Sequence, residues 1–404
     1  MRGRRRHLCA GCAKRMRLHG SDKNRTNDGV VGMFGIAILG YGIVGSGVGT
    51  ILSEQAKRLS DATGEEICLK YVVDIQDVKV PEGVKLTKNF DEVLADTDVR
   101  LVVETIGGAR IAYEYTRRAL EAGKNVVTSN KELVATHGDT LLPLAAEKGV
   151  RYLYEAAVGG GIPVLFPIYE LLLASPIKAV TGIVNGTTNY ILTRMKEANA
   201  SFPAALGEAR SLGYLEADPS ADIDGWDARR KLAILGNACF GARFDDDAKI
   251  PFEGISRVAY EDVELAGKMG MEIKLIAHGE RTENGWTGWV SPTLLPANHP
   301  VCAARDVFNA ICVTGEAVGD VMFYGRGAGS LPTASAVVGD VVQIARNPKA
   351  TGNKAAAGAS FDAENAKGSF CARVNGEFVR LDNVTREEAA EKFGPDAGAV
   401  LRVL

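Results

Sequence analysis

A short apolar stretch runs directly into a glycine-rich turn, and this junction limits the fold more than any other feature. Residues 34–39 are Phe-Gly-Ile-Ala-Ile-Leu, residues 40–45 are Gly-Tyr-Gly-Ile-Val-Gly, and residues 46–59 have a helical pattern. The glycines allow a tight turn and close approach to a phosphate, towards which the helix directs unpaired N–H groups. The sequence therefore predicts a strand, a turn and a helix that bind a dinucleotide through Gly40, Gly42, Ile43, Val44 and Gly45.

The second predicted strand, over residues 67–73, ends in an acidic residue. Asp74 stands where a carboxylate accepts hydrogen bonds from the ribose hydroxyls of a dinucleotide and repels a 2′-phosphate. Ile75 and Gln76 follow it, and a basic residue comes only at Lys79. We expect NAD as the cofactor, with use of NADP as the open alternative.

Strands and helices then alternate, as in a Rossmann-type, doubly wound parallel sheet. Ligands of such sheets bind at the carboxyl ends of the strands. Glu104, Thr105, residues 129–131 and Glu155 follow strand ends and are candidates by position, with Thr105 expected at the cofactor. The predicted strands are 100–104, 125–128 and 151–154, and the predicted helices are 109–122 and 131–148.

An acidic stretch precedes an apolar helix in the middle of the chain. Five carboxylates and one lysine lie within residues 216–231. Asp227 and Lys231 are four residues apart, so on a helix they project from one face. A carboxylate beside an ammonium suits a substrate that has an amino group and a reacting oxygen. The alternative is a solvated acidic loop with one surface ion pair.

Beyond residue 155 the alternating pattern ends, and residues 156–346 are expected to form an α+β domain for substrate binding and dimerisation. A glycine-rich turn at 325–329 precedes a helix that returns to the Rossmann domain, which we place at 33–155. Residues 347–404 are expected to be a linker and a short C-terminal module. Within the second domain we expect a helix over 162–173, a strand over 177–184, and short strands and turns over 250–325.

Residues 1–32 differ from the rest of the chain because they are basic and lack an apolar period. We expect them to be disordered or non-native, with the natural chain beginning at Met33. Cys9 and Cys12 have the spacing of metal ligands, but no second pair follows nearby. A zinc site and a basic arm that binds nucleic acid are the alternatives for this segment.

Composition narrows the class of protein and of partner. A net charge of −3 does not indicate nucleic acid, and no apolar run is long enough to span a membrane. The seven cysteines are scattered and odd in number, which favours a reducing cytoplasm over a disulfide framework. We expect a cytoplasmic enzyme with a small-molecule substrate.

Five motifs, in this order, resemble homoserine dehydrogenase. The resemblance spans roughly residues 34–346 and implies that the chain interconverts L-aspartate 4-semialdehyde and L-homoserine with a nicotinamide cofactor, in threonine, methionine and isoleucine biosynthesis. The motifs are Thr-Ser-Asn-Lys at 128–131, Glu-Ala-Ala-Val-Gly-Gly-Gly-Ile-Pro at 155–163, Gly-Ile-Val-Asn-Gly-Thr-Thr-Asn-Tyr at 182–190, the stretch 213–231, and Tyr-Gly-Arg-Gly-Ala-Gly at 324–329.

The resemblance also implies roles for individual residues. Lys231 is the expected general acid and base, and Lys131 is expected near both the nicotinamide and the reacting oxygen. The chemistry of aldehyde reduction agrees, because a cationic donor protonates and stabilises the developing alkoxide. The remaining expected residues are Asp227 (catalysis), Glu216, Asp222, Asp227 and Lys231 (substrate), and Gly213, Gly327 and Lys131 (cofactor).

The resemblance further implies a structural sodium ion. Oxygen atoms are the ligands that such a hard cation prefers. We also expect a homodimer, because the mixed second domain looks suited to supply an interface and two-fold dimers are the commonest assembly. The tail is shorter than the regulatory ACT domain of many members, so a reduced ACT-like remnant is an alternative for it. The expected sodium-binding residues are Glu155, Val158, Gly160 and Ile162.

Two other functions are compatible with these residues. A related dehydrogenase acting on another amino-acid aldehyde would retain the acidic stretch and both lysines. A sensor that binds NAD(H) without catalysis would retain the glycine-rich turn, but it would have little need of Lys131 and Lys231 as proton donors.

Overall fold

The first part of the chain forms a parallel sheet of six strands, in the order β3-β2-β1-β4-β5-β6. This computed structural model describes residues 32–215, 218–347, 358–363 and 367–404. The order of the strands reverses beside β1, where a doubly wound sheet binds its ligand. The strands are β1 (Met33–Leu39), β2 (Glu66–Val73), β3 (Lys85–Thr87), β4 (Val99–Glu104), β5 (Asn125–Thr128) and β6 (Tyr152–Leu153).

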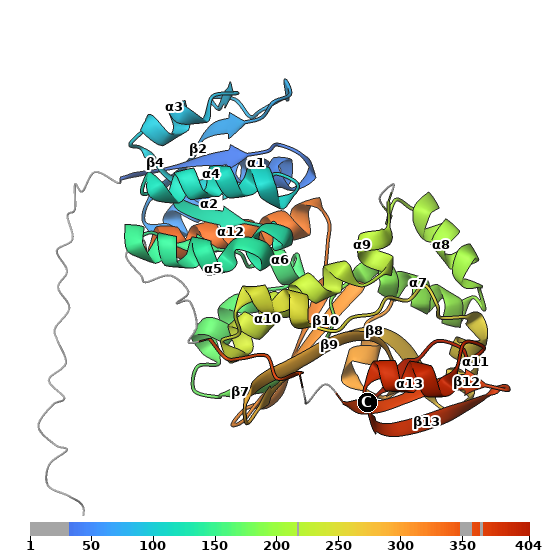
Figure 1. The fold of residues 1–404 in the computed structure, drawn as a ribbon. Helices are drawn as coiled ribbons and strands as arrows, with labels where there is room; N and C mark the ends of the chain where they lie inside the picture. Colours follow the sequence, from blue (N-terminus) through green and yellow to red (C-terminus); the bar gives the residue numbers. More distant parts are fainter. Residues whose placement is uncertain (1–31, 216–217, 348–357, 364–366) are drawn as a thin grey trace, which may run out of the picture. The chain divides into compact units, whose positions relative to one another are not determined.

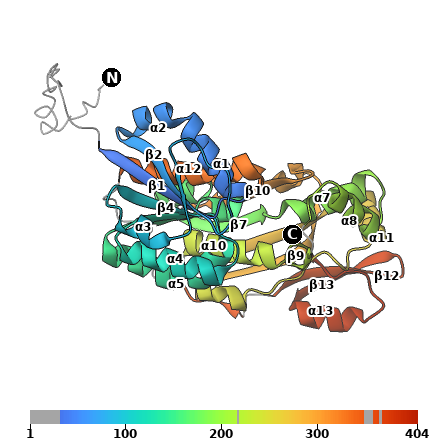
Figure 2. The same ribbon diagram turned by 90° about the horizontal axis from the view of Figure 1, so that it is seen from above.

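Helices cover both faces of this sheet, because the apolar side chains of β1 alternate between them. Phe34, Ile36 and Ile38 pack in a core with α1 and α12, whereas Ala37 and Leu39 belong to the core with α3, α4 and α5. Helix α12 lies along α1, although the two are far apart in sequence (Figures 1 and 2). The helices are α1 (Ile43–Glu54), α2 (Ala56–Thr63), α3 (Phe90–Ala95), α4 (Ala109–Glu121), α5 (Lys131–Lys148) and α12 (Ser330–Arg346).

A second sheet of eight strands has the order β11-β10-β7-β8-β9-β14-β12-β13. Its pairs are antiparallel except that β14 runs parallel to β9. The strands are β7 (Ile177–Ile183), β8 (Met271–Thr282), β9 (Gly285–Pro296), β10 (Phe308–Gly315), β11 (Gly319–Arg326), β12 (Gly368–Val374), β13 (Glu377–Val384) and β14 (Leu401–Val403). The predicted class, a Rossmann-type α/β sheet with a separate mixed sheet, is confirmed.

Helix α10 (Trp226–Phe240) packs on the second sheet and carries the predicted lysine. Gly236 lets α10 approach strand β9 closely, because a Cβ at this position would lie 2.8 Å from the ring of Trp286. Trp286 itself is completely buried. The other helical segments are α6 (Ala156–Gly159), η1 (Pro167–Leu171), α7 (Gly186–Glu197), α8 (Phe202–Ser211), α9 (Ser220–Ile223), η2 (Phe244–Lys249), α11 (Tyr260–Lys268), η3 (Pro300–Ala303) and α13 (Arg386–Phe393).

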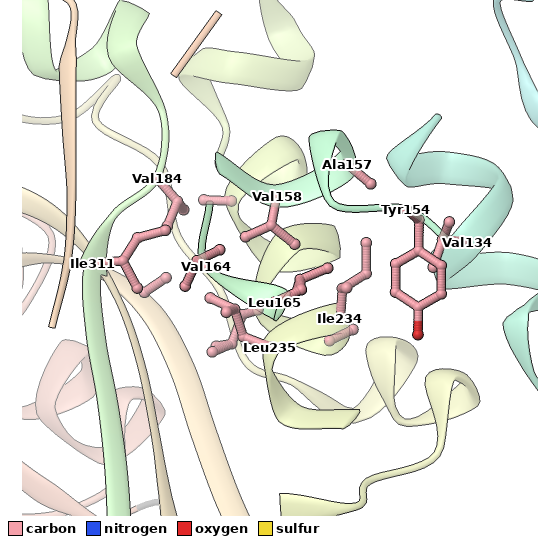
Figure 3. Packing of buried hydrophobic residues seen from close by; sticks show 14 of the residues in the cluster. Val134, Tyr154, Ala157, Val158, Val164, Leu165, Val184, Ile234, Leu235 and Ile311 are labelled. Atoms are coloured by element: carbon pink, nitrogen blue, oxygen red, sulfur yellow. The ribbon is translucent and has the colours of Figure 1, made fainter. Parts of the chain in front are cut away.

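The segment that leaves the first sheet is packed into the main apolar core. Figure 3 shows Val158, Val164 and Leu165 next to Ile234 and Leu235 of α10. All five side chains are at most 2% exposed. Because this core is shared, helix α10 has a fixed position relative to the carboxyl edge of the parallel sheet.

The helix predicted over residues 162–173 is shorter than expected, because only residues 165–171 are helical. Its last five residues form the π-helical segment η1, in which Leu172 N donates to the Pro167 carbonyl. Pro167 lies in the first turn, where its missing N–H costs no helical bond, so the proline is compatible with the start of this short helix. The single helix predicted over 46–59 is divided into α1 and α2 at Gln55.

The short strands predicted over residues 250–325 are wrong, because β8 and β9 are 12 residues each. They form one long hairpin that is buried on both faces, so it lacks the alternation of a half-exposed strand. Two charged residues of β8, Glu272 and Lys274, are buried as well. The carboxylate of Glu272 lies 2.6 Å from Lys196 Nζ and 2.8 Å from an Arg305 nitrogen.

The C-terminal residues continue the second sheet rather than trail from it. Strand β14 joins the β12–β13 pair to β9, and Leu401 is completely buried in the main core. Residues 33–404 form one compact unit, so the predicted domain boundaries within it stay predictions. Cys9, Cys12 and the rest of residues 1–31 lie outside the described residues. Within the described part, no helix is long and apolar enough to cross a membrane.

We expect Leu401→Ala to lower the free energy of unfolding by about 2–5 kcal/mol, the usual effect of truncating a buried leucine. Because Leu401 belongs to the main core, one cooperative transition should shift as a whole in urea. Val379→Ala, at a position 43% exposed on β13, is the control and should have little effect. A shift confined to a separate minor transition would show that the C-terminal strands fold independently.

Candidate active site

The turn after β1 requires two of its glycines for its own geometry. Gly40 has a φ of +81°, in the left-handed region that favours glycine. A Cβ at Gly45 would lie 2.1 Å from the Gly40 carbonyl oxygen and 2.8 Å from the Thr105 hydroxyl. That hydroxyl donates to the carbonyl oxygens of Leu39 and Gly40, at 3.0 and 2.7 Å. Thr105 therefore braces the turn from the end of the neighbouring strand.

Gly42 is not required by the packing of the turn, because nothing lies within 4 Å of the position of its missing Cβ. It is the residue before α1, and no side chain caps the first N–H groups of that helix. Ile43, the next residue, is 74% exposed, and Val44 is half-buried. Open space beside uncapped helical N–H groups fits the pyrophosphate of a dinucleotide.

Asp74 lies beside the same turn, directly after β2. Its Oδ2 accepts a hydrogen bond from Tyr41 N at 2.7 Å, and its Oδ1 accepts one from Gln76 N at 2.9 Å. A carboxylate has about four lone-pair positions, so it can accept further bonds. The residues predicted for the cofactor at Gly40, Gly42, Gly45, Asp74 and Thr105 are thus brought together at one edge of the sheet.

Three structural elements meet at the carboxylate of Asp227. Its Oδ1 lies 2.7 Å from Nζ of Lys131, the first residue of α5, and its Oδ2 lies 2.7 Å from Nζ of Lys231. The Lys231 ammonium also donates to the Val184 carbonyl at 2.7 Å. Asp227 and Lys231 are only 3% and 8% exposed. The alternative of a solvated loop with a surface ion pair is therefore wrong.

Burial and neighbouring charges shift the pKa values of the two lysines of this cluster in opposite directions. The charge of Asp227 raises the pKa of Lys131, whose side chain is 41% exposed. Burial lowers the pKa of Lys231, and the neighbouring Lys131 lowers it further. Burial works to raise the pKa of Asp227, but the two ammonium groups outweigh it and hold that pKa well below its usual range. One carboxylate thus separates a firmly protonated lysine from one that releases its proton more readily.

Asn185 completes the cluster, and the sequence motif had not suggested a role for it. Its amide nitrogen donates to Asp222 Oδ1 at 2.7 Å and to Asp227 Oδ2 at 2.9 Å. Asp222 is half-buried, and its pKa is raised by burial and by the charge of Asp227. The predicted substrate residues Asp222, Asp227 and Lys231 therefore lie together around one amide.

Lys131 is positioned by a chain of hydrogen bonds that begins inside the parallel sheet. Glu104 Oε2 accepts from the Thr128 hydroxyl at 2.5 Å, and that hydroxyl accepts from Asn130 N at 2.9 Å. The Asn130 side chain then caps α5 by accepting from Leu133 N at 3.0 Å. Burial raises the pKa of Glu104 to about 7. The sequence indicated Glu104 by its place at a strand end, but not this contact.

The structure says less about the other residues that were predicted to bind the substrate or the cofactor. Glu216 lies outside the described residues. Gly213, with a φ of +75°, ends the turn after α8, and the Tyr214 carbonyl accepts from the Thr187 hydroxyl at 3.1 Å. Gly213 therefore lies on the α7 side of the site, near the segment that carries Asn185.

Gly327 and Gly160 touch each other where the two parts of the chain meet. A Cβ on Gly160 would lie 2.2 Å from the Gly327 carbonyl oxygen, and one on Gly327 would lie 1.9 Å from the Asn309 amide nitrogen. The Ser330 hydroxyl donates to the Ile43 carbonyl at 2.7 Å, which joins this turn to α1. Gly327 thus lies between the predicted sodium segment and the glycine-rich turn.

The predicted sodium segment is built around the buried carboxylate of Glu155. It accepts three backbone N–H groups, from Val164, Leu165 and Phe166, at 2.5–2.7 Å. The backbone N–H of Glu155 donates to Asp340 at 2.9 Å. Burial raises the pKa of both carboxyl groups, and the charge of Glu155 raises that of Asp340 further. Val158 and Ile162 are buried in the same segment.

Comparison with known proteins decides the family. A family model described as homoserine dehydrogenase matches residues 163–342, and one for the NAD-binding domain of homoserine dehydrogenase matches residues 40–155. The homoserine dehydrogenase of Bacillus subtilis is 42% identical over 326 residues, which are 79% of this chain and 75% of that protein. The chain belongs to the homoserine dehydrogenase family. It is therefore an NAD(P)-dependent oxidoreductase that interconverts L-aspartate 4-semialdehyde and L-homoserine.

Solved homoserine dehydrogenases share the fold. A structure from Thiobacillus denitrificans superposes with a TM-score of 0.84 at 34% identity and covers 92% of this chain and 98% of that one. A hyperthermophilic archaeal homoserine dehydrogenase in complex with NADPH superposes with a TM-score of 0.64 at 28% identity, over 77% of this chain and 97% of that one. The family predicted from the five motifs is confirmed, and a sensor without catalysis is not favoured.

Two alanine variants should separate the structural glycines of the turn from the one that admits the cofactor. Gly45→Ala should lower the melting temperature of the protein without ligand, because its Cβ would meet the backbone of Gly40. Gly42→Ala should leave that temperature unchanged, because its Cβ would meet no other atom of the protein. The Cβ would project into the space expected for the pyrophosphate and should weaken NADH binding about tenfold or more, since hydrogen bonds to a charged group are strong. NADH fluorescence titration measures the affinity. Unchanged affinity in Gly42→Ala would place the pyrophosphate elsewhere.

Proposed function

We propose that Lys231 transfers the proton and that Lys131 and Asp227 assist it in the homoserine dehydrogenase reaction. An ammonium group has three N–H donors. Two of those on Lys231 are directed at the Val184 carbonyl and the Asp227 carboxylate, at 2.7 Å each. The third remains for the substrate's oxygen. This arrangement of the Lys231 ammonium is the observation that carries the proposal.

A bound nicotinamide supplies the hydride for aldehyde reduction and accepts it in homoserine oxidation. In the first direction Lys231 donates a proton to the forming alkoxide, and in the second it removes the proton of the hydroxyl. Lys131 keeps its charge, because Asp227 raises its pKa, and can stabilise negative charge on the same oxygen. Asp227 holds both ammonium groups in place.

Recognition of the amino acid is assigned to the carboxylates. Asp222 is half-buried and lies on the exposed side of the buried Asp227, so it can accept the ammonium group of the substrate. Glu216 keeps the same role from the family resemblance. Selectivity against other amino-acid aldehydes would depend on the distance between these carboxylates and Lys231.

For the cofactor we propose a preference for NAD, with Asp74 binding the ribose hydroxyls. Its contacts with Tyr41 N and Gln76 N hold the carboxylate at the edge of the turn, where it would repel a 2′-phosphate. One relative of known structure carries NADPH, so use of NADP by this chain is the alternative. Gly213 and Gly327 are proposed to line the cofactor from the second domain.

A sodium ion between the two parts of the chain fits the residues present. The amide of Asn309 is completely buried and has no hydrogen-bond partner within the described residues. It lies against Gly327, which touches Gly160. An amide oxygen and backbone carbonyls of Val158, Gly160 and Ile162 are suitable ligands for a hard cation. Because Glu155 already accepts three N–H groups, we propose that its carboxylate mainly orients this segment.

We further propose a homodimer formed through the edge of the second sheet. Strand β11 is the terminal strand on one side of that sheet, and its residues are exposed or half-buried. Met322 and Tyr324 on it are 41% and 50% exposed. An exposed strand edge with large apolar side chains is a common site of association. The biosynthetic pathways and the cytoplasmic location named above remain predictions from the family and the cysteines.

Replacing Lys231 should abolish turnover while leaving the cofactor bound. We expect Lys231→Ala to lower kcat for L-homoserine oxidation by about 10²–10⁴-fold, the usual contribution of a general base. In the wild type, oxidation needs the neutral amine, so the rate should rise with pH through a pKa below 10.5, because burial lowers the pKa of Lys231. Aldehyde reduction needs the ammonium form and should fall over the same range.

Lys231→Arg is the matched control for this experiment. Arginine keeps the positive charge but does not lose its proton at these pH values. It should therefore bind NADH like the wild type and lack the rise of oxidation rate with pH. Appreciable turnover with an unchanged pH profile in either variant would remove Lys231 from the mechanism.

The preference for NAD should depend on Asp74. We expect the wild type to oxidise L-homoserine with a higher kcat/KM for NAD than for NADP. Asp74→Ser should lower that ratio about tenfold or more, because the repulsion of a 2′-phosphate and the ribose hydrogen bonds are both lost. Absorbance of the reduced cofactor measures both reactions in parallel. The same ratio in variant and wild type would show that Asp74 does not select the cofactor.

A further inference from the structure

Asn185 has a fixed orientation at the start of α7. Its side-chain oxygen accepts hydrogen bonds from Thr188 N at 2.9 Å and from the Thr188 hydroxyl at 3.0 Å. The residue is the N-cap of the helix and is 5% exposed. Because the oxygen faces the helix, the amide nitrogen must point the other way, into the site.

The amide nitrogen meets two carboxylates there. It lies 2.7 Å from Asp222 Oδ1 and 2.9 Å from Asp227 Oδ2. An amide nitrogen has two hydrogens, so it can donate one to each carboxylate. The preceding residue, Val184, holds the Lys231 ammonium through its carbonyl oxygen. One strand end therefore positions both carboxylates and the lysine.

Such a contact matters because two neighbouring carboxylates repel each other. Asp227 is compensated by ammonium groups 2.7 Å away on each of its oxygens, from Lys131 and Lys231. Asp222 has the amide of Asn185 instead. Without that donor, Asp222 would move away from Asp227 or take up a proton, and either change removes its negative charge from the site.

We propose that Asn185 is a positioning residue that keeps Asp222 ionised beside Asp227 as a separate anionic group for the substrate's ammonium. Asp227 then remains with the two lysines at the reacting oxygen. Asn185 thus divides the carboxylates between recognition of an α-amino group and proton transfer. The inference rests on the proposed function and deepens it, because it names the group that makes an amino-acid aldehyde the substrate.

Two substitutions keep the helix cap and remove the amide donor. A serine or threonine oxygen can accept from the N–H of residue 188, so Asn185→Ser and Asn185→Thr retain the cap. Neither can donate to both carboxylates. We expect KM for L-homoserine to rise about tenfold or more, the effect of losing a hydrogen bond to a charged group. KM for NAD should stay unchanged, and kcat should fall less than KM rises.

The change in KM should also depend on pH. The charged groups that face Asp222 are Asp227, Lys131 and Lys231. With the donor absent, the repulsion from Asp227 is less opposed, so Asp222 takes up a proton at a higher pH than in the wild type. KM for homoserine in Asn185→Ser should therefore rise as pH falls, over a range in which wild-type KM is constant. A merely structural defect would not produce this dependence.

The loss of a helix cap is controlled separately. Thr385→Ala removes the N-cap of α13, a helix in the C-terminal part of the chain, and should lower thermal stability without changing KM. If Asn185→Ser does not fold, Asn185→Thr gives the same test. The proposal would be overturned if a folded Asn185→Ser or Asn185→Thr protein had the KM and the pH profile of the wild type. An equal rise in KM for homoserine and for NAD would also overturn it.

Asp222→Asn, assayed in parallel, separates this inference from the proposed function. A rise in KM for homoserine in Asp222→Asn, but not in the Asn185 variants, would contradict only the role of Asn185. Wild-type KM in Asp222→Asn would show that Asp222 does not bind the substrate. This inference and the proposed recognition by Asp222 would then both fail, whereas proton transfer by Lys231 is tested by Lys231→Ala. A rise in both, with the pH dependence in Asn185→Ser, is the result expected.

Discussion

The buried carboxylate of Asp227 is the contact on which the site depends. It joins Lys131 at the start of α5, Lys231 from α10, and Asn185 at the start of α7. A buried carboxylate is costly unless it is paired and hydrogen-bonded, and each of these donors offsets part of that cost. Because the three donors come from separate elements, the site can form only when the two sheets are assembled against each other.

The apolar core makes that assembly definite. Ile234 and Leu235 of α10 pack against Val158, Val164 and Leu165 of the segment leaving the first sheet (Figure 3). Lys231 and Asp227 lie nearer the start of the same helix, so the packing of its apolar face also sets their direction. Close-packed interiors shift little, which keeps the distances of 2.7 Å at the ammonium groups stable.

The local parts of this arrangement were predictable from the sequence. The glycine-rich turn has a fixed chemistry, and the spacing of Asp227 and Lys231 requires only a helix. The contacts of Asn185 and Glu104 could not be predicted, because their partners are 24 to 42 residues away. The long hairpin β8–β9 was missed for a related reason. Lys196 and Arg305, from other parts of the chain, pair with its buried Glu272, and Lys274 donates to the Asn189 side chain and the Ala304 carbonyl.

Differences in burial explain why the pKa values of two lysines that share one carboxylate shift in opposite directions. Both ammonium groups lie 2.7 Å from Asp227, so its attraction acts on each. Lys131 is 41% exposed at its side chain and the attraction prevails, which raises its pKa. Lys231 is almost completely enclosed, and the loss of hydration prevails, which lowers its pKa. The fold thereby places two ammonium groups, with pKa values shifted in opposite directions, on one carboxylate.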